Sequence, residues 1–379
     1  MYSILRDELI KTSDVIVVKV GTNVLTHDNG HLNEERIERL ASDIAMMFKN
    51  NKRVVLVTSG AVGAGMCSLN LSLRPVEIAE LQAVAAIGQG KLIEVYERFM
   101  SKHGLCTAQV LLTADDFADR KRYLHLRNTI LALLKFNALP IINENDTVSV
   151  SMLHTTFGDN DHLASLVANL FDTPLLILLT DVDGLYDRDP ADPAAKLITV
   201  VEQWTQDLMG MVAAKRSKLS KGGMSSKLKA AKIITESGGN VIIANGDDSE
   251  SLHKIFNAQE IGTLFITQDN HMSARKRWLG FAVRAEGKIT LDDGAVKAVK
   301  TNGKSLLPIG VIAVAGAFDR GAIVSMIDRN GNEIARGLTN YNKDDLIKIQ
   351  GKKTNEIRQI LGHSVYTEVV HRDNLQVTD

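Results

Sequence analysis

Apolar and polar positions along this chain follow two different periods, one typical of buried strands and one typical of helices. The clearest strand pattern lies at 15–20 and reads V-I-V-V-K-V, interrupted only by Lys19. Continuous apolar runs of this length predict strands that are covered on both faces in a parallel sheet. Similar runs predict further strands at 53–58, 107–112, 139–143, 174–180, 241–244 and 264–266.

Helical patterns separate these strands. Asn33 is expected to cap a helix that has Glu34 and Glu35 in its first turn. Pro75 is expected to open a long helix that ends near Met100. Other helices are predicted at 120–137, 159–170 and 221–237. Alternating strands and helices predict an α/β fold, an αβα sandwich with a mainly parallel central sheet.

The pattern changes near residue 270. Short strands separated by Gly and Asp turns are predicted at 287–291, 310–314, 322–327 and 333–338. Between the last two, D-R-N-G-N at 328–332 is a hairpin-turn sequence. We therefore predict a small, β-barrel-like C-terminal domain at 285–379, joined by a linker at 268–284 to a larger domain at 1–267.

Composition and charge exclude several classes of protein. From Asn270 onward the chain has seventeen Lys and Arg against twelve Asp and Glu, so the excess of +5 is far from that of a strongly basic nucleic-acid binder. No run approaches the roughly 18 apolar residues of a membrane span, and 1–12 lacks a signal-peptide core. Cys67 and Cys106 are too few for a disulfide scaffold, so we expect a cytoplasmic protein.

Glycine turns after two predicted strands are candidate ligand sites. A cation beside exposed backbone N–H groups, as at Lys19 and Gly21, suits a phosphate, although the lysine could also extend to solvent at a sheet edge. Residues 59–65 contain G-x-x-G-x-G, which is neither the dinucleotide fingerprint nor a P-loop. We interpret it as a flexible turn where backbone approaches a small ligand; close packing of a helix on a strand is the alternative.

Two polar clusters lie next to predicted helices or strands. F-G-D-N-D at 157–161 precedes a helix, where Asp159 or Asn160 could serve only as the N-cap, while Asp161 could hold a lysine ammonium. N-E-N-D-T at 143–147 closes a strand. Open α/β sheets bind ligands beyond the carboxyl ends of their strands, so this cluster could contact a ligand or form a plain turn.

Two later motifs suit a nucleotide. T-D-V-D-G-L-Y-D at 180–187 resembles a calcium loop but has Asp192 where the loop needs Glu, and it fits the wall of a nucleotide site better. G-G-M-S-S-K at 222–227 opens a helix and offers N–H groups plus Lys227 to an anion, unless it is an ordinary helix start. The ten histidines form no zinc-ligand spacing, so no protein metal site is predicted.

Taken in order, these motifs resemble the amino-acid kinase family. The resemblance is based on seven motifs: V-V-K-V-G-T at 17–22, T-S-G-A-V-G-A-G at 58–65, Q-x-x-A-A-x-G-Q at 82–89, I-I-N-E-N-D-T at 141–147, F-G-D-N-D at 157–161, L-T-D-V-D-G-L-Y at 179–186 and G-G-M-S-S-K at 222–227. The C-terminal part resembles a PUA domain through L-D-D-G-A at 291–295, S-L-L-P-I-G-V at 305–311, G-x-F-x-x-G at 316–321 and I-A-R-G-L at 334–338. One departure is that Ser220-Lys221 and Ser226 stand where the family has Gly-Thr and Thr.

The resemblance implies ATP-dependent phosphorylation of the γ-carboxylate of L-glutamate, the first step of proline biosynthesis. A carboxylate with a pKa of about 4.3 needs no general base, but anion attacking anion requires positive charge. The implied catalytic residues are Lys19, Lys227 and Asp161, and the implied glutamate contacts are Ser59, Asp146 and Asn160. ATP would be bound by Lys19, Thr180, Asp181, Lys221, Gly222, Gly223, Met224, Ser225, Ser226 and Lys227.

The resemblance also implies cofactors, partners and alternatives. Mg²⁺ would bridge the ATP phosphates with few direct protein ligands. Proline would inhibit at a site that overlaps the glutamate site, the kinase domain would form a dimer or tetramer, and glutamyl phosphate reductase would be a functional partner. An N-acetylglutamate kinase or a uridylate kinase is the alternative within the fold. An RNA-binding protein is the alternative from another class, disfavoured because Trp278 is the only tryptophan of the C-terminal region.

Overall fold

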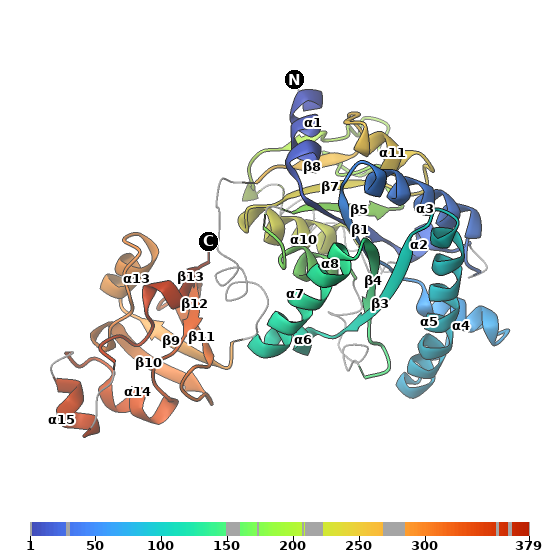
Figure 1. The fold of residues 1–379 in the computed structure, drawn as a ribbon. Coiled ribbons are helices and arrows are strands. Elements are labelled where there is room, and N and C mark those ends of the chain that lie inside the picture. Colours follow the sequence, from blue (N-terminus) through green and yellow to red (C-terminus); the bar gives the residue numbers. More distant parts are fainter. Residues whose placement is uncertain are drawn as a thin grey trace. The chain divides into compact units, whose positions relative to one another are not determined.

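The computed structural model describes residues 2–27, 31–148, 160–172, 174–206, 208, 223–267, 285–353, 356–362 and 366–378. The chain forms two compact units, a larger one made mostly of residues up to 271 and a smaller one made mostly of the residues that follow (Figure 1). Each unit has a sheet and a hydrophobic core of its own. The predicted linker at 268–284 lies outside the described residues.

An eight-stranded sheet forms the centre of the larger unit, in the order β3-β4-β2-β1-β5-β7-β8-β6. Neighbouring strands are parallel, except that β7 and β8 pair antiparallel. The strands are β1 Val15–Val20, β2 Arg53–Val57, β3 Cys106–Leu112, β4 Ala138–Glu144, β5 Leu175–Thr180, β6 Val200–Val201, β7 Asn240–Asn245 and β8 Thr263–Phe265. All six residues of β1 are buried, as its continuous apolar run predicts.

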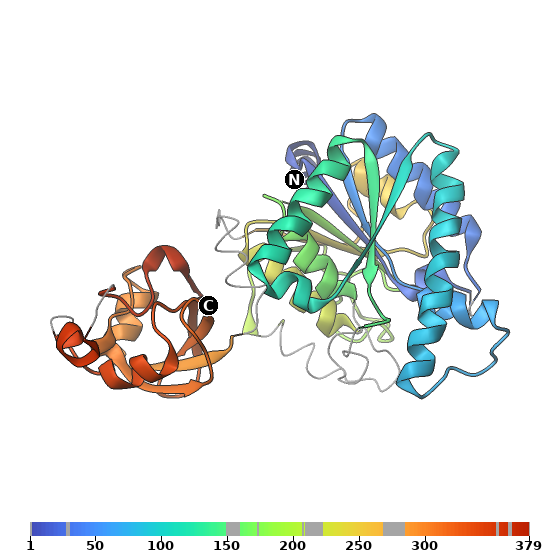
Figure 2. The same ribbon diagram turned by 60° about the horizontal axis from the view of Figure 1, so that its bottom comes forward.

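Helices cover both faces of this sheet (Figure 2). On one face α3, α5 and α11 share a hydrophobic core with the strands, and on the other face α8 contacts β1 and β5 while α10 contacts β7. The helices are α1 Tyr2–Thr12, α2 Thr22–Leu25, α3 Glu34–Lys49, α4 Ala61–Ser68, α5 Ile78–Ser101, α6 Ala114–Ala118, α7 Arg120–Lys135, α8 Asn160–Ala168, α10 Met224–Glu236 and α11 Ser251–Phe256. The predicted αβα sandwich with a mainly parallel sheet is confirmed.

Two predictions about the region after β2 were wrong. The long helix α5 begins at Ile78 rather than at Pro75. Most of the glycine-rich stretch predicted as a turn is helix α4, and only Gly60, with φ of 99°, has a left-handed turn conformation. A Cβ atom on Gly65 would lie 1.9 Å from the Val84 carbonyl oxygen of α5. This glycine therefore permits the close packing of two helices.

The smaller unit is built on a five-stranded sheet in the order β10-β9-β11-β12-β13. A hairpin joins β11 to β12, and its turn is closed by the Asp328 side chain, which accepts from the backbone N–H groups of Asn330 and Asn332. The elements are β9 Gly287–Leu291, α13 Asp293–Lys300, η3 Pro308–Gly310, β10 Val311–Gly316, β11 Ile323–Ile327, β12 Glu333–Leu338, α14 Lys343–Ile349, α15 Ile357–Leu361, η5 Arg372–Asn374 and β13 Leu375–Val377. The predicted small C-terminal β domain is confirmed.

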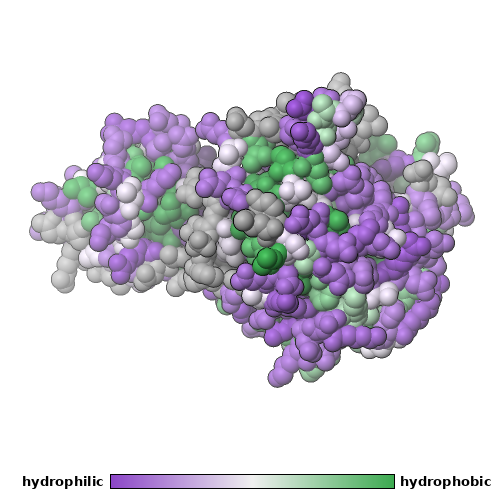
Figure 3. Space-filling model, turned by 90° about the horizontal axis from the view of Figure 1, so that it is seen from above, coloured by the Kyte–Doolittle hydropathy of each residue, from purple (hydrophilic) through white to green (hydrophobic). Residues whose placement is uncertain are grey.

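Hydrophilic residues cover most of the face of the larger unit that is visible in Figure 3. Within the described ranges, none of the helices combines the length and the apolar composition that a bilayer crossing requires. Cys67 and Cys106 are both free thiols.

Candidate active site

Three elements bring two lysines to one buried carboxylate. Lys19 lies near the end of β1 and forms an ion pair with Asp161 in the first turn of α8. Lys227 lies one turn into α10, and its Nζ atom is 3.1 Å from Asp161 Oδ2. All three side chains are buried. The residues that the sequence analysis implied to be catalytic are therefore in direct contact, although they are far apart in the sequence.

Two ammonium groups converge on one buried carboxylate at the carboxyl end of β1, and the charge of Lys227 also acts on Asp181. Burial raises the pKa of Asp161, but Lys19 and then Lys227 lower it by more, so that the pKa lies below its usual range. The Ser226 hydroxyl, 3.0 Å from Asp161 Oδ2, adds a hydrogen-bond donor. Two ammonium groups held in fixed positions at the start of a helix can bind an anion together, so the cluster is suited to a phosphoryl group.

Asn160, the first residue of α8, connects the ends of two strands. Its side-chain Nδ2 lies 2.6 Å from the Thr58 carbonyl oxygen, 2.8 Å from Ser59 Oγ and 3.0 Å from Asn143 Oδ1. Asn143 in turn donates to Gln89 Oε1 over 2.8 Å. Ser59 and Asn160, both implied to contact glutamate, therefore lie side by side at the carboxyl ends of the strands, where open α/β sheets bind ligands.

Asp146 lies two residues beyond the end of β4 and is half-buried. Burial, and then the charge of Glu144, raise the pKa of Asp146 to about 6, although Arg74 lowers it. Burial and the nearby negative charge make the ionised form of this carboxylate less stable than that of an exposed one. A cationic ligand offsets both effects and therefore stabilises the carboxylate more than it would an exposed one. Asp146 is thus suited to bind an ammonium group.

A second group of polar side chains follows β5, the neighbour of β1. Thr180 ends this strand, and its hydroxyl lies 3.0 Å from Asp181 Oδ1. Asn23 donates to the other Asp181 oxygen over 2.9 Å. Burial raises the pKa of Asp181, but the hydrogen bonds from Asn23 and Thr180 lower it by more. The strand order reverses between β1 and β5, so these residues line the switch point of the sheet.

The start of α10 supplies backbone donors beside the lysine cluster. Gly223 is the N-cap residue and provides no side-chain cap, so the first-turn N–H groups of Met224 and Ser225 remain available to an anion. Ser226 is already engaged, because its N–H group donates to the Gly223 carbonyl. Lys221 and Gly222 lie outside the described residues, as do 157–159 of the F-G-D-N-D motif.

Asn143 and Gln89 were not predicted as individual site residues, although 143–147 was a candidate ligand cluster and both belong to quoted motifs. Both side chains are buried, and a buried amide needs a polar partner. Asn143 directly follows the apolar run of β4, which was an available signal, whereas α5 carries other polar residues around Gln89 and gave none. The hydrogen bond from Asn23 to Asp181 was not predicted either. Asn23 follows a strand at a position where a helix-capping residue is common, so its type did not indicate a role in the site.

Comparison with known proteins gives two family matches. The model of the amino acid kinase family matches residues 14–245, and the model of the PUA domain matches residues 287–361. The glutamate 5-kinase of Caldanaerobacter subterraneus subsp. tengcongensis is 49% identical over 365 residues, which cover 96% of this chain and 98% of the relative. The glutamate 5-kinase of Moorella thermoacetica is 48% identical over 363 residues, which cover 96% of each chain.

Among solved structures, the chain is similar to carbamate kinase from Giardia lamblia bound to AMP-PNP. That similarity has a TM-score of 0.47 and 19% sequence identity, and it covers 68% of this chain and 99% of the other.

Proposed function

The chain belongs to the amino acid kinase family, and from this premise we propose that it transfers the γ-phosphoryl group of ATP to the γ-carboxylate of L-glutamate. The product is L-glutamyl 5-phosphate, and the reaction is the first step of proline biosynthesis. Relatives that are glutamate 5-kinases align over 96% of the chain, including the PUA domain. The structural observation that carries the proposal is the buried pair of lysines held by Asp161.

The chemistry assigned to this cluster is neutralisation of negative charge. The γ-carboxylate of glutamate, with an ordinary pKa of about 4.3, is ionised at neutral pH and attacks without a general base. Its approach to the ATP phosphates is opposed by charge repulsion, which Lys19 and Lys227 would reduce from two directions. Asp161 would act as a positioning residue that holds both ammonium groups in line with the transferred phosphoryl group.

Glutamate would lie between the ends of β2 and β4. The Ser59 hydroxyl, which accepts from Asn160, would donate its own proton to a glutamate carboxylate, Asn160 would contact glutamate beside it, and Asp146 would pair with the α-ammonium. N-acetylglutamate has an amide in place of that ammonium and offers Asp146 no cation. The environment of Asp146 therefore favours free glutamate as the acceptor.

ATP would lie across β5 and the start of α10, in contact with Thr180, Asp181 and the segment from Lys221 to Lys227. Mg²⁺ would bridge the phosphate oxygens. Asp161 is engaged by both lysines and is not offered to a metal ion. Across the described residues no group of three or more His, Cys, Asp and Glu side chains could hold a metal ion, so the proposed Mg²⁺ would be coordinated mostly by phosphate and water.

The proposal has further parts that follow from membership of the family. Proline, which carries the same α-amino and carboxylate groups as glutamate, would inhibit by binding at an overlapping site. The kinase domain would assemble into a dimer or tetramer, and glutamyl phosphate reductase would consume the product. The boundaries would be 1–267 for the kinase domain and 285–379 for the PUA domain. The two free thiols are in keeping with a cytoplasmic location.

The test uses hydroxylamine, which traps an acyl phosphate as a hydroxamate. Purified protein with ATP, Mg²⁺ and L-glutamate is expected to form hydroxamate, and N-acetylglutamate is expected to give little. Lys227→Ala should reduce turnover at least 100-fold, whereas Lys229→Ala, an exposed lysine on the same helix, should retain it. Near-normal turnover of Lys227→Ala would contradict the lysine assignment. Signal with N-acetylglutamate alone would contradict the assigned substrate.

A further inference from the structure

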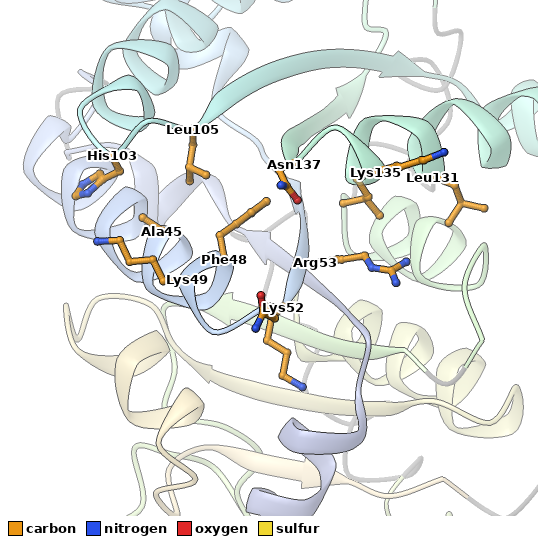
Figure 4. A pocket seen from close by; sticks show the side chains of 12 residues that line it. Ala45, Phe48, Lys49, Lys52, Arg53, His103, Leu105, Leu131, Lys135 and Asn137 are labelled. Atoms are coloured by element: carbon orange, nitrogen blue, oxygen red, sulfur yellow. The ribbon is translucent and has the colours of Figure 1, made fainter.

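A second candidate site lies at the opposite edge of the central sheet. A cavity of about 650 Å³ opens where three helices end and three adjacent strands begin: α3 leads into β2, α5 into β3 and α7 into β4 (Figure 4). The candidate active site lies at the other ends of these strands. A strand of seven residues, such as β4, separates the two edges by about 20 Å.

The walls of the cavity combine apolar and basic side chains. Phe48 and Leu105 lie in its middle, with Lys49 and His103 on one side of them and Arg53 on the other (Figure 4). Lys52 and Lys135 complete the basic set, and none of the twelve lining residues is acidic. A cavity of this composition offers an apolar surface for the body of a ligand and positive charge for its anionic groups.

Most of these cations are not neutralised by the protein. The Lys52 ammonium donates to the carbonyl oxygens of Lys11 and Ser13, over 2.8 and 3.1 Å. Among the residues that the structure describes, no carboxylate lies within 4.0 Å of the charged groups of Lys49, Arg53 or Lys135. By contrast, exposed lysines elsewhere on the same unit, such as Lys91 and Lys102, pair with a neighbouring glutamate.

A simpler role for two of these lysines is to offset helix dipoles. Lys49 and Lys135 lie in the last turns of α3 and α7, where basic residues are favourable. Each helix end carries roughly −0.5 charge, so the three ends around the cavity sum to about −1.5. Lys49, Arg53 and Lys135 contribute three full positive charges, and the charge of Lys52 is offset in part by Asp14. Dipole compensation therefore leaves a clear positive excess in the cavity.

We propose that this cavity binds a small organic phosphate that has an aromatic or other apolar body. The phosphate would pair with Arg53 and Lys135 while the body lies on Phe48 and Leu105. The guanidinium fork of Arg53 matches the geometry of a phosphate, and the ammonium of Lys135 adds a compact point charge. The site is separate from the proposed kinase chemistry and does not depend on it.

Calorimetric titration of the full-length protein with 1-naphthyl phosphate tests the proposal. We expect saturable binding with one site in the Lys227→Ala variant, which weakens phosphate binding at the candidate active site. Adding Arg53→Gln and Lys135→Gln to that background should weaken this binding at least tenfold. Adding Lys11→Gln and Lys91→Gln instead removes the same charge from exposed positions and should have no effect.

Two further measurements separate charge from folding and from apolar adsorption. Arg53→Lys with Lys135→Arg keeps the charges and should keep the affinity within about threefold, which shows that lost affinity in the Gln variants is not a folding defect. 1-Naphthol, which lacks the phosphate, should bind at least tenfold more weakly. Equal binding of naphthol, equal loss in the two Gln pairs, or absence of binding in the Lys227→Ala background would overturn the proposal.

Discussion

The affinity for glutamate should depend on the ionisation of Asp146. Burial, and then Glu144, raise the pKa of this carboxyl to about 6. Only the ionised form can pair with the α-ammonium of glutamate. With that pKa, about 97% of the free protein is competent at pH 7.5 and about 9% at pH 5. The KM for glutamate should therefore rise about tenfold between these pH values.

The sign of the effect follows from linkage. Binding of a cation next to Asp146 favours its charged form, so glutamate lowers the pKa of this group and binding releases a proton between about pH 5 and 6. Protonation of glutamate itself contributes little. Its γ-carboxylate, with a pKa of about 4.3, is still about 80% ionised at pH 5.

The assay follows ADP by chromatography at pH 7.5, 6 and 5, with glutamate and then ATP as the varied substrate. The KM for glutamate should rise as the pH falls, and the KM for ATP should change less than threefold. Asp146→Asn should have a high KM for glutamate already at pH 7.5 and should show no further rise. A flat profile for the wild-type protein, or the same slope in Asp146→Asn, would refute the assignment of Asp146 to the ammonium group.

Two other predictions concern the lysine cluster and the helix packing. Asp161→Asn should lower kcat at least 100-fold with a smaller change in the KM for glutamate, because Lys19 and Lys227 lose the group that positions them; an equal rise in KM would indicate a direct substrate contact instead. Gly65→Ala should lower the free energy of unfolding by about 1–3 kcal/mol in a denaturant titration, since its Cβ would overlap the Val84 carbonyl of α5. Gly90 lies on α5 with open space around it, so Gly90→Ala should instead raise the free energy of unfolding by about 0.5–1 kcal/mol. Similar losses of stability in the Gly65→Ala and Gly90→Ala variants would contradict the packing argument.

Much of the fold could be predicted because the signals are local. The continuous apolar run at 15–20 gave β1 its observed bounds, and Asn33 caps α3 through a hydrogen bond from the Arg36 N–H group, as its position predicted. Helix α4 could not be predicted in the same way. Its glycines disfavour a helix locally, and only the contact between Gly65 and α5 makes them favourable.

The site shows the same division between local and long-range information. Asp161 was predicted from its own motif to hold a lysine, and the chain does place Lys19 and Lys227 on its two oxygens. The hydrogen bond between Asn143 and Gln89 joins residues that are 54 positions apart, and no short motif encodes which of them will meet. The two-residue strand β6 is likewise too short to give a periodic signal.

The sharing of Asp161 by two buried lysines restricts how this sequence can diverge. Removing the carboxylate leaves two ammonium groups facing each other out of water, and removing one partner of a buried ion pair typically costs about 3–5 kcal/mol of stability. A descendant that abandoned catalysis would need to replace all three residues together to recover that stability. The three residues therefore depend on one another, and we expect a substitution at any one of them to destabilise the cluster unless the other two change with it.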